Sequence, residues 1–184
     1  MSDAPSGTAV ASHTQQWARW FVPPLLVVLI VDQVTKAWVF NLDPSTLSPT
    51  GWLAQHYNTG VAWGLGNQMP LIVTLVTMIL IPLLTWVWWK QFRLCGAAEN
   101  LAFGAVLGGA LGNAIDRVLT QLQFGQMRGV RDFIVVDFRP LGIEYIWPTF
   151  NVADAGISCG VVALALLSLF KRPASAPPGA HAVI

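Results

Sequence analysis

Charged side chains are scarce in this chain, because only 10% of its 184 residues are Asp, Glu, Lys or Arg. Soluble domains carry about 25%, so too few charges remain here to cover a water-soluble globule. Disorder needs low hydrophobicity and high net charge, whereas 54% of these residues are hydrophobic. The 10 Lys and Arg against 9 Asp and Glu leave no basic excess for nucleic acid. The composition predicts a membrane protein that binds no nucleic acid.

Cysteine and histidine are also rare, which excludes several kinds of site. The two cysteines, Cys95 and Cys159, are too few for a disulfide framework or a Cys-rich metal site. All three histidines lie outside the apolar segments, at His13, His56 and His181. Neither a His-Glu-x-x-His zinc site nor an embedded Ser–His pair is therefore available. We predict no metal and no cofactor, and among hydrolases only an aspartate pair remains.

Four apolar segments approach the roughly 20 residues that a membrane-spanning helix needs. We read the first as a retained helix and not as a removable signal peptide, because Asp32 and Lys36 interrupt it and no small-residue cleavage site follows. The predicted fold is an all-α membrane protein with a single domain over residues 17–172 and disordered polar tails at 1–16 and 173–184. The four predicted helices cover about residues 21–40, 69–89, 101–121 and 152–170.

The distribution of Lys and Arg predicts the orientation in the membrane. Lys90 and Arg93 lie in the short connection between the second and third helices, whereas residues 41–68 contain no Lys or Arg. We therefore expect both termini in the cytoplasm and the connections 41–68 and 122–149 outside. Strand-forming residues at 52–57 predict a small β-rich lid in the first outer loop.

Five ionisable residues interrupt the predicted spans, where each one facing lipid would cost about 2.5–3.5 kcal/mol. The helix directions place Asp116 at the outer end of the third helix and Asp154 at the outer start of the fourth. Two neighbouring carboxylates share a proton, and so supply both a base for water and an acid for the scissile bond. The spacing also permits the alternative that each aspartate has a separate structural partner. The five residues are Asp32, Lys36, Asp116, Arg117 and Asp154.

Five local motifs follow one another over about residues 31–157. They are Asp32-Gln33-Val34-Thr35-Lys36, the segment Tyr57–Trp63, the segment Gly108–Arg117, Asp132-Phe133-Ile134, and Phe150-Asn151-Val152-Ala153-Asp154. In this order they resemble the bacterial lipoprotein signal peptidase family, also called signal peptidase II. The resemblance implies an intramembrane aspartyl endopeptidase of the bacterial inner membrane. It would cut a prolipoprotein before its diacylglyceryl-modified cysteine, near the outer face and in contact with membrane lipid, and we expect a monomer.

The resemblance also implies roles for individual residues. Asp116 and Asp154 match the family's catalytic pair, and we assign Asp132 and Gly60 to structural roles in the outer loops. The stretch 118–130 is longer than is usual in the family, so we expect an altered outer loop. Six further residues match polar positions that support the pair or bind substrate, namely Asn58, Asn113, Arg117, Asn151, Asp32 and Lys36.

Several of these residues have a structural alternative. Asn113 and Asn151 each precede an aspartate by three residues, which suits an amide that orients a carboxylate and equally suits helix capping. Asp32 and Lys36, spaced i and i+4, form either a tethering ion pair or a substrate contact. Arg117 binds either a lipid phosphate or the outer loop.

Two other classes of function compete with a protease. One is a proton-coupled transporter in which Asp32, Asp116 and Asp154 form a relay. The other is an assembly factor that uses a close-packing seam of glycines at every fourth residue, Gly104, Gly108 and Gly112. The second apolar segment contains no ionisable residue, which disfavours a proton pathway through the membrane.

Overall fold

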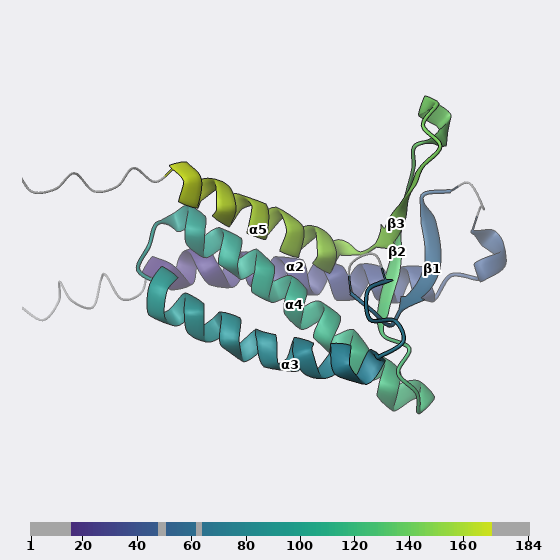
Figure 1. Ribbon diagram of the computed structural model, residues 1–184, viewed down its shortest axis with the longest axis horizontal. Coiled ribbons are helices and arrows are strands. Elements are labelled where there is room, and N and C mark those ends of the chain that lie inside the picture. The colour runs from purple at the N-terminus through teal and green to yellow at the C-terminus, as the bar shows by residue number, and fades with distance from the viewer. Residues whose placement is uncertain (1–15, 48–50, 62–63, 171–184) are drawn as a thin grey trace, which may run out of the picture.

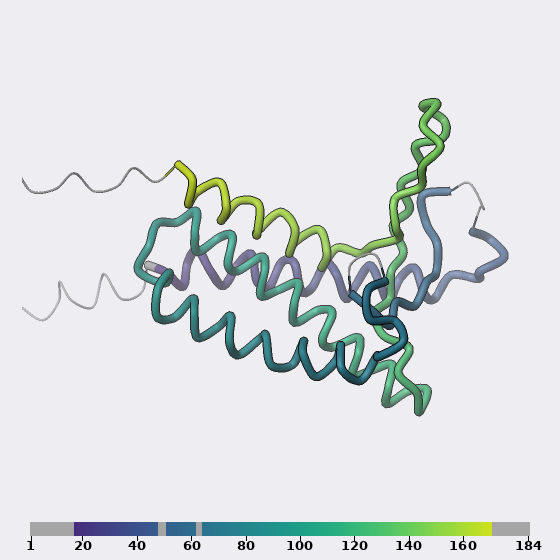
Figure 2. Tube along the Cα trace, viewed as in Figure 1, coloured from purple at the N-terminus to yellow at the C-terminus, as the bar shows by residue number. Residues whose placement is uncertain are grey.

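The computed structural model describes residues 16–47, 51–61 and 64–170, and it consists mostly of helices with one small sheet. The helices lie side by side, and the sheet crosses one end of the bundle (Figure 1). The trace in Figure 2 shows that the described chain begins and ends at the opposite end of the bundle. The predicted tails fall almost wholly outside the described residues.

Three of the four predicted spans are confirmed as long, apolar helices, at Trp17–Phe40, Pro70–Phe92 and Val152–Phe170. They correspond to α2 (Gln16–Phe40), α3 (Pro70–Val87) with the π-helical turn η3 (Trp88–Phe92), and α5 (Val152–Phe170). The fourth predicted span, residues 101–121, corresponds to α4 (Ala97–Phe124). This helix is less apolar and is not among the three helices that are long and apolar enough to cross a membrane.

Helix α4 is the central helix of the bundle. It buries 15 of its 28 residues, whereas α3 buries only Val73. It packs against α2, α3 and α5. Because its neighbours cover it, α4 tolerates polar residues that a lipid-facing helix would have to exclude.

The glycine seam on α4 brings α2 unusually close, as the spacing of the glycines predicted. A Cβ atom at Gly104 or Gly108 would collide with the backbone carbonyl of Phe21 or Leu25, respectively. A Cβ atom at Gly112 would lie only 2.6 Å from Oδ2 of the Asp32 carboxylate. The seam therefore lets the acidic part of α2 reach the polar end of α4.

An aromatic cluster closes the end of the bundle that lies away from the sheet. Phe21 and Trp88 stack with their ring centroids 3.8 Å apart, and Phe103 and Leu107 pack against them. The Trp88 indole Nε1 donates a hydrogen bond of 2.9 Å to the buried Asn100. This end is thus packed with large side chains, whereas the buried ion pairs of Lys36 with Asp32 and Asp116 lie toward the sheet end.

Three strands form an antiparallel sheet in the order β1–β2–β3. The expected strand in the first outer loop is present as β1 (Leu53–Asn58). It pairs with β2 (Val130–Asp137), which forms a hairpin with β3 (Ile146–Phe150). Pairing of His56 with Asp132 sets the register. In Figure 1 the hairpin runs across the direction of the helices and projects past α5.

The long stretch 118–130 is only partly the loop that the sequence suggested. Helix α4 continues through it to Phe124 and ends at Gly125, whose φ of +64° lies in the left-handed region that favours glycine. The extra length therefore extends α4 by about two turns before β2 begins.

Candidate active site

A cavity of about 830 Å³ opens where the sheet meets the helices. Helices α3, α4 and α5 supply its apolar wall, which includes Leu80, Ile81 and Ile157. The sheet and the helix ends supply a polar wall. The polar lining residues include Asn58, Asn113, Arg117, Asp132 and Asp154, but Asp116 does not line the cavity.

Asp154 lies in the first turn of α5 and is held by amides. Asn113 Nδ2 donates a hydrogen bond of 2.8 Å to its Oδ1, and the backbone N–H of Asn151 donates one of 3.2 Å to its Oδ2. The side-chain oxygen of Asn151 in turn accepts the backbone N–H of Asp154 at 2.9 Å. Asn151 therefore caps α5 and orients its carboxylate at once, so the two alternatives for this residue coexist.

Asp132 lies on β2 and is almost completely buried, with 1% of its surface exposed. Asn58 Nδ2 and Asn151 Nδ2 donate to its two oxygens at 3.1 and 2.7 Å. Burial, together with the negative charge of Asp154, raises the pKa of Asp132 to about 7, although both amide hydrogen bonds oppose the shift. Near neutral pH this carboxyl group therefore exists in both protonation states.

The amide of Asn151 connects the two carboxyl groups that face the cavity. Its Nδ2 reaches Asp132 while its backbone N–H reaches Asp154. The same Nδ2 also donates to Asn113 Oδ1 at 3.2 Å, and Lys36 Nζ donates to that oxygen at 3.0 Å. With its oxygen occupied by two donors, Asn113 must present its NH₂ group to Asp154.

Asp116 occupies a different environment, which is fully buried and rich in cations. Arg131 contacts its carboxylate through Nη2 at 2.7 Å and through the backbone N–H at 2.8 Å. Lys36 Nζ lies 3.3 Å from Asp116 and 2.8 Å from Asp32. The structure therefore joins Asp116 to two cations and does not bring it to the cavity with Asp154.

Asp32 and Lys36 form the expected i, i+4 ion pair, with both side chains fully buried. Asp32 Oδ1 also accepts the backbone N–H of Ala153, next to Asp154, at 2.9 Å. The pair on α2 thus holds the start of α5 as well as the polar end of α4.

Arg117 lies at the edge of the cavity and contacts the first outer loop. Its Nη2 donates to the carbonyl of Gly60 at 2.8 Å, and the N–H of Gly60 donates to Asn58 Oδ1 at 3.0 Å. Arg117 was expected to bind either a lipid phosphate or the outer loop, and these contacts are with the outer loop. Gly60 is held by these bonds, and a Cβ there would meet the Leu65 carbonyl at 2.5 Å.

Two residues of the site were missed by the sequence reasoning. Arg131 supplies three donors to Asp116, namely its backbone N–H, Nε and Nη2. Gln33 bridges the two residues, because its Nε2 donates to Asp116 at 3.3 Å and its Oε1 accepts from Arg131 at 3.2 Å. Gln33 stands inside a recognised motif and Arg131 directly precedes Asp132, so both residues lay next to positions that the sequence had indicated. Their contacts with Asp116 could not be predicted, because contacts between distant segments leave no local signal in the sequence.

Metal-ion chemistry has no obvious ligand set here, since the described part of the chain contains no group of three or more His, Cys, Asp or Glu side chains that could hold an ion. Neither cysteine forms a disulfide within the described residues, and Cys159 is exposed on α5.

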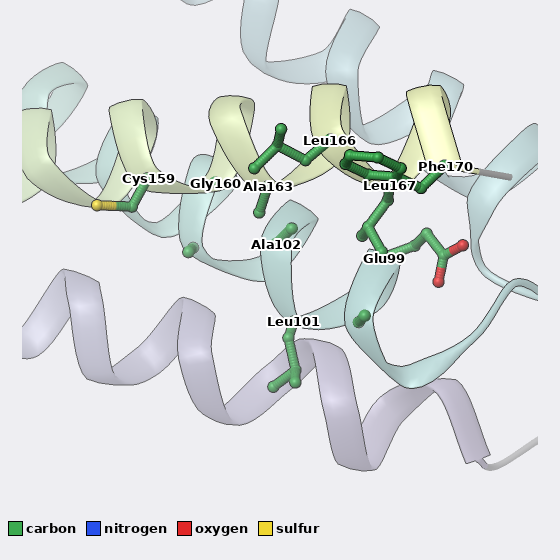
Figure 3. Close-up of a pocket in the computed structure, with 11 residues that line it drawn as sticks. Glu99, Leu101, Ala102, Cys159, Gly160, Ala163, Leu166, Leu167 and Phe170 are labelled. Carbon is green, nitrogen blue, oxygen red and sulfur yellow. The ribbon is translucent and has the colours of Figure 1, made fainter.

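A second hollow, of about 680 Å³, lies between α4 and α5 toward the far end of the bundle (Figure 3). Its walls are mostly Ala and Leu side chains, and among the described residues that line it Glu99 alone is charged. Without a second acid or an amide among its lining residues, it offers no general acid–base pair. The cavity beneath the sheet is therefore the candidate active site.

Comparison with known proteins identifies relatives over most of the chain. A family model described as signal peptidase (SPase) II matches residues 25–170. The lipoprotein signal peptidase of Aquifex aeolicus is 36% identical over 151 residues, which cover 80% of this chain and 84% of that protein. The lipoprotein signal peptidase of Pseudoalteromonas atlantica is 33% identical over 155 residues, which cover 80% and 87%, respectively.

Solved structures with a similar fold come from bacterial membrane enzymes determined by the in meso method. One, at 2.3 Å resolution, has a TM-score of 0.67 and 26% identity, and the match covers 86% of this chain and 92% of that one. Another, at 1.9 Å resolution, has a TM-score of 0.59 and 31% identity, and the match covers 82% of this chain and 92% of that one. The resemblance indicated by the motifs is confirmed: the chain belongs to the signal peptidase II family.

Proposed function

We propose that this chain is an intramembrane aspartyl endopeptidase that removes the signal peptide from prolipoproteins, cutting before the diacylglyceryl-modified cysteine. The name of its relatives, lipoprotein signal peptidase, supports this class of substrate. One observation carries the mechanism: Asp132 and Asp154 line the same cavity and are bridged by Asn151. We therefore propose Asp132 and Asp154 as the catalytic pair, with Asp132 in the place that we first assigned to Asp116.

Asp116 suits a structural role better than a catalytic one. A general acid or base must reach the proton that it transfers, and Asp116 is fully buried away from the cavity. Its ion pairs with Lys36 and Arg131 also stabilise the ionised form, so it has no proton to donate. Its function is to hold α2, α4 and β2 together.

The proposed reaction begins with the proton on Asp132 and the negative charge on Asp154. Asp154 takes a proton from water as the water oxygen bonds to the scissile carbonyl carbon, while Asp132 gives its proton to the carbonyl oxygen. The product is a neutral geminal diol. Asp154 then protonates the leaving nitrogen, Asp132 takes a proton from the diol, and the C–N bond breaks. Both carboxyl groups return to their starting states, without a covalent intermediate.

The other wall of the cavity suits an apolar peptide. Leu80 and Ile81 of α3 face the same space as Ile157 of α5, so apolar residues of a signal peptide would be shielded from water beside the carboxyl pair. Arg117 and Gly60 hold the outer loop at the rim. We propose that Asn58, Asn113 and Asn151 orient the carboxyl groups and that the loop at Gly60 borders the substrate.

We also propose that α4 spans the membrane with the three apolar helices. Its polar residues are covered by α2, α3 and α5, so the insertion cost of charges facing lipid does not apply to them. Lys90 and Arg93 lie at the end away from the sheet, which favours a cytoplasmic location for that end and for both termini. The enzyme would act as a monomer with its active site near the outer face.

Cleavage of a diacylated prolipoprotein by the purified protein, followed by gel shift, tests the proposal. Asp132→Asn and Asp154→Asn should each lose about 10²–10⁴-fold in rate, the range that a general acid or base contributes. Asp137→Asn is the matched control, because Asp137 lies on the same strand as Asp132 and pairs only with the exposed Arg139. Retained cleavage by a folded Asp132→Asn variant would exclude the proposed pair.

A further inference from the structure

The outer half of the β2–β3 hairpin exposes large apolar side chains. Leu141 is 76% exposed and Ile143 is 54% exposed at the tip. On β3, Ile146 and Trp147 are 44% and 43% exposed. Because neighbouring residues of a strand point to opposite faces, neither face of the hairpin is fully covered by the protein here. Exposed apolar surface of this kind marks an interaction site.

The hairpin is attached directly to the end of an apolar helix. β3 ends at Phe150 and α5 begins at Val152, so Asn151 alone separates them. One residue spans at most about 3.6 Å, which keeps the base of the hairpin at the level where α5 ends. From there the hairpin runs across the bundle and its tip passes beyond α5 (Figure 1). The hairpin therefore projects sideways, beyond the outline of the bundle, and does not continue along the direction of the helices.

One face of the hairpin looks back toward the helices. Val136, Phe138 and Trp147 line the active-site cavity together with side chains of α3 and α5. Tyr145 stacks on Phe138 at 6.3 Å and meets Trp147 edge to face at 6.2 Å. These three aromatic residues form a ledge that leads outward from the cavity. Tyr and Trp are the residues enriched where a membrane meets water.

The charges of the hairpin limit how deeply it can lie. Asp137 and Arg139 form an exposed ion pair of 2.7 Å, and Glu144 lies on the returning side of the tip. Backbone groups at the edges of so small a sheet also need water or headgroups as partners, which the hydrocarbon core cannot provide. Apolar tip residues beside charged ones suit the headgroup region.

We infer that the β2–β3 hairpin is a membrane-interface anchor, whose tip and aromatic ledge rest in the phospholipid headgroups of the leaflet at the sheet end of the bundle. The anchor holds the mouth of the cavity at the membrane surface. This inference requires only that the helices cross a bilayer and is independent of the proteolytic chemistry.

Nitroxide labels in nanodiscs of phosphatidylethanolamine and phosphatidylglycerol test the anchor without measuring cleavage. Leu141→Cys and Ile143→Cys are labelled in a background with Cys95→Ser and Cys159→Ser. Ser45→Cys is the matched control, since Ser45 is exposed in the short helix η1 (Pro44–Thr46) at the same end of the bundle. All three labelled positions are exposed, so the label displaces no packed side chain.

At positions 141 and 143 we expect relaxation by dissolved oxygen to exceed relaxation by a water-soluble nickel chelate, at a depth of about 5–10 Å within the interface. The label at position 45 should show the reverse order. Labels at 141 and 143 that behave like the control would overturn the inference. Dipolar broadening between tip labels, lost on dilution with unlabelled protein, would overturn it as well, because the occupant would then be a second copy of this chain.

Discussion

Two groups of carboxylates lie near one another at the sheet end of the bundle, and they are stabilised in opposite ways. Asp32 and Asp116 are ion-paired with Lys36 and closed off from the cavity. Asp132 and Asp154 are held by neutral amides and line the cavity. The cations compensate the charge of the first group, which suits the structural role proposed for it. The second group faces the cavity among neutral amides, which suits the acid–base role proposed for it.

The largest expected effect on stability comes from breaking the cationic group. Asp116→Asn leaves the buried Lys36 without one partner and Arg131 without its carboxylate, so the free energy of unfolding should fall by about 3–5 kcal/mol. Thermal unfolding in detergent at neutral pH measures the loss. Asp132→Asn is the comparison, because it removes a negative charge that has no cationic partner within hydrogen-bonding distance. If Asp132→Asn destabilises the protein more than Asp116→Asn, the contrast between the two groups is wrong.

The pH dependence of stability should carry the signature of Asp132. Its pKa in the folded protein is about 7, above the ordinary value of 3.8, so between these values the folded state binds more protons than the unfolded state. The favourable contribution is therefore complete below about pH 4 and is lost as the pH rises through about 7. The difference between the folded pKa of Asp132 and its ordinary value corresponds to a loss of unfolding free energy on the order of 4 kcal/mol.

The difference in unfolding free energy between wild type and Asp132→Asn isolates this contribution from other titrating groups. In acid, the unfolding free energy of the wild type should be at its highest relative to that of the variant, and this difference should decline as the pH rises toward about 8. Chemical unfolding across the pH range measures it. A difference that stays flat with pH, or that grows toward alkaline pH, would contradict the assigned pKa.

A smaller effect is expected from Asn58→Ala. The variant loses the 3.1 Å hydrogen bond that stabilises the ionised form of Asp132, worth about 0.5–1.5 kcal/mol. The pKa of Asp132 should rise, which shifts the alkaline limb of the cleavage profile to higher pH. Gln55→Ala is the matched control on the same strand, because Gln55 bonds only to the carbonyls of Val39 and Leu42. An equal shift in both variants would show that the change is structural.

Local sequence patterns were sufficient for most of the helical architecture. The apolar segments at 69–89 and 152–170 match α3 with its π turn and α5 closely, because lipid-facing helices are apolar along nearly their whole length. Spacing of the glycines on α4 correctly indicated a close-packing seam, and the structure shows that α2 is the helix packed against it. The hairpin of β2 and β3 was not predicted, since its strands gain their definition by pairing with each other and with β1.

The position of Asp116 relative to the cavity could not be predicted from the sequence. Asp116 and Asp154 were paired because they lie at similar positions along two helices and because the resemblance to the family implied it. The position of a residue along a helix does not specify the direction in which its side chain points around the helix axis. On α4, Asn113 and Arg117 line the cavity. Asp116 points instead toward Lys36 and Arg131.

Composition and motif order alone established that this chain is a membrane protein of the signal peptidase II family, and they named every acid at the site. Which acids share a cavity was decided only by tertiary structure. The register of β2 against β1 brings Asp132 beside Asn58. Asn151 then connects the two carboxyl groups, since its side-chain amide donates to Asp132 and its backbone N–H donates to Asp154 at the start of α5. The physical reason is that charge and burial depend on neighbours from distant segments, and those neighbours surround Asp116 with cations and Asp132 with amides.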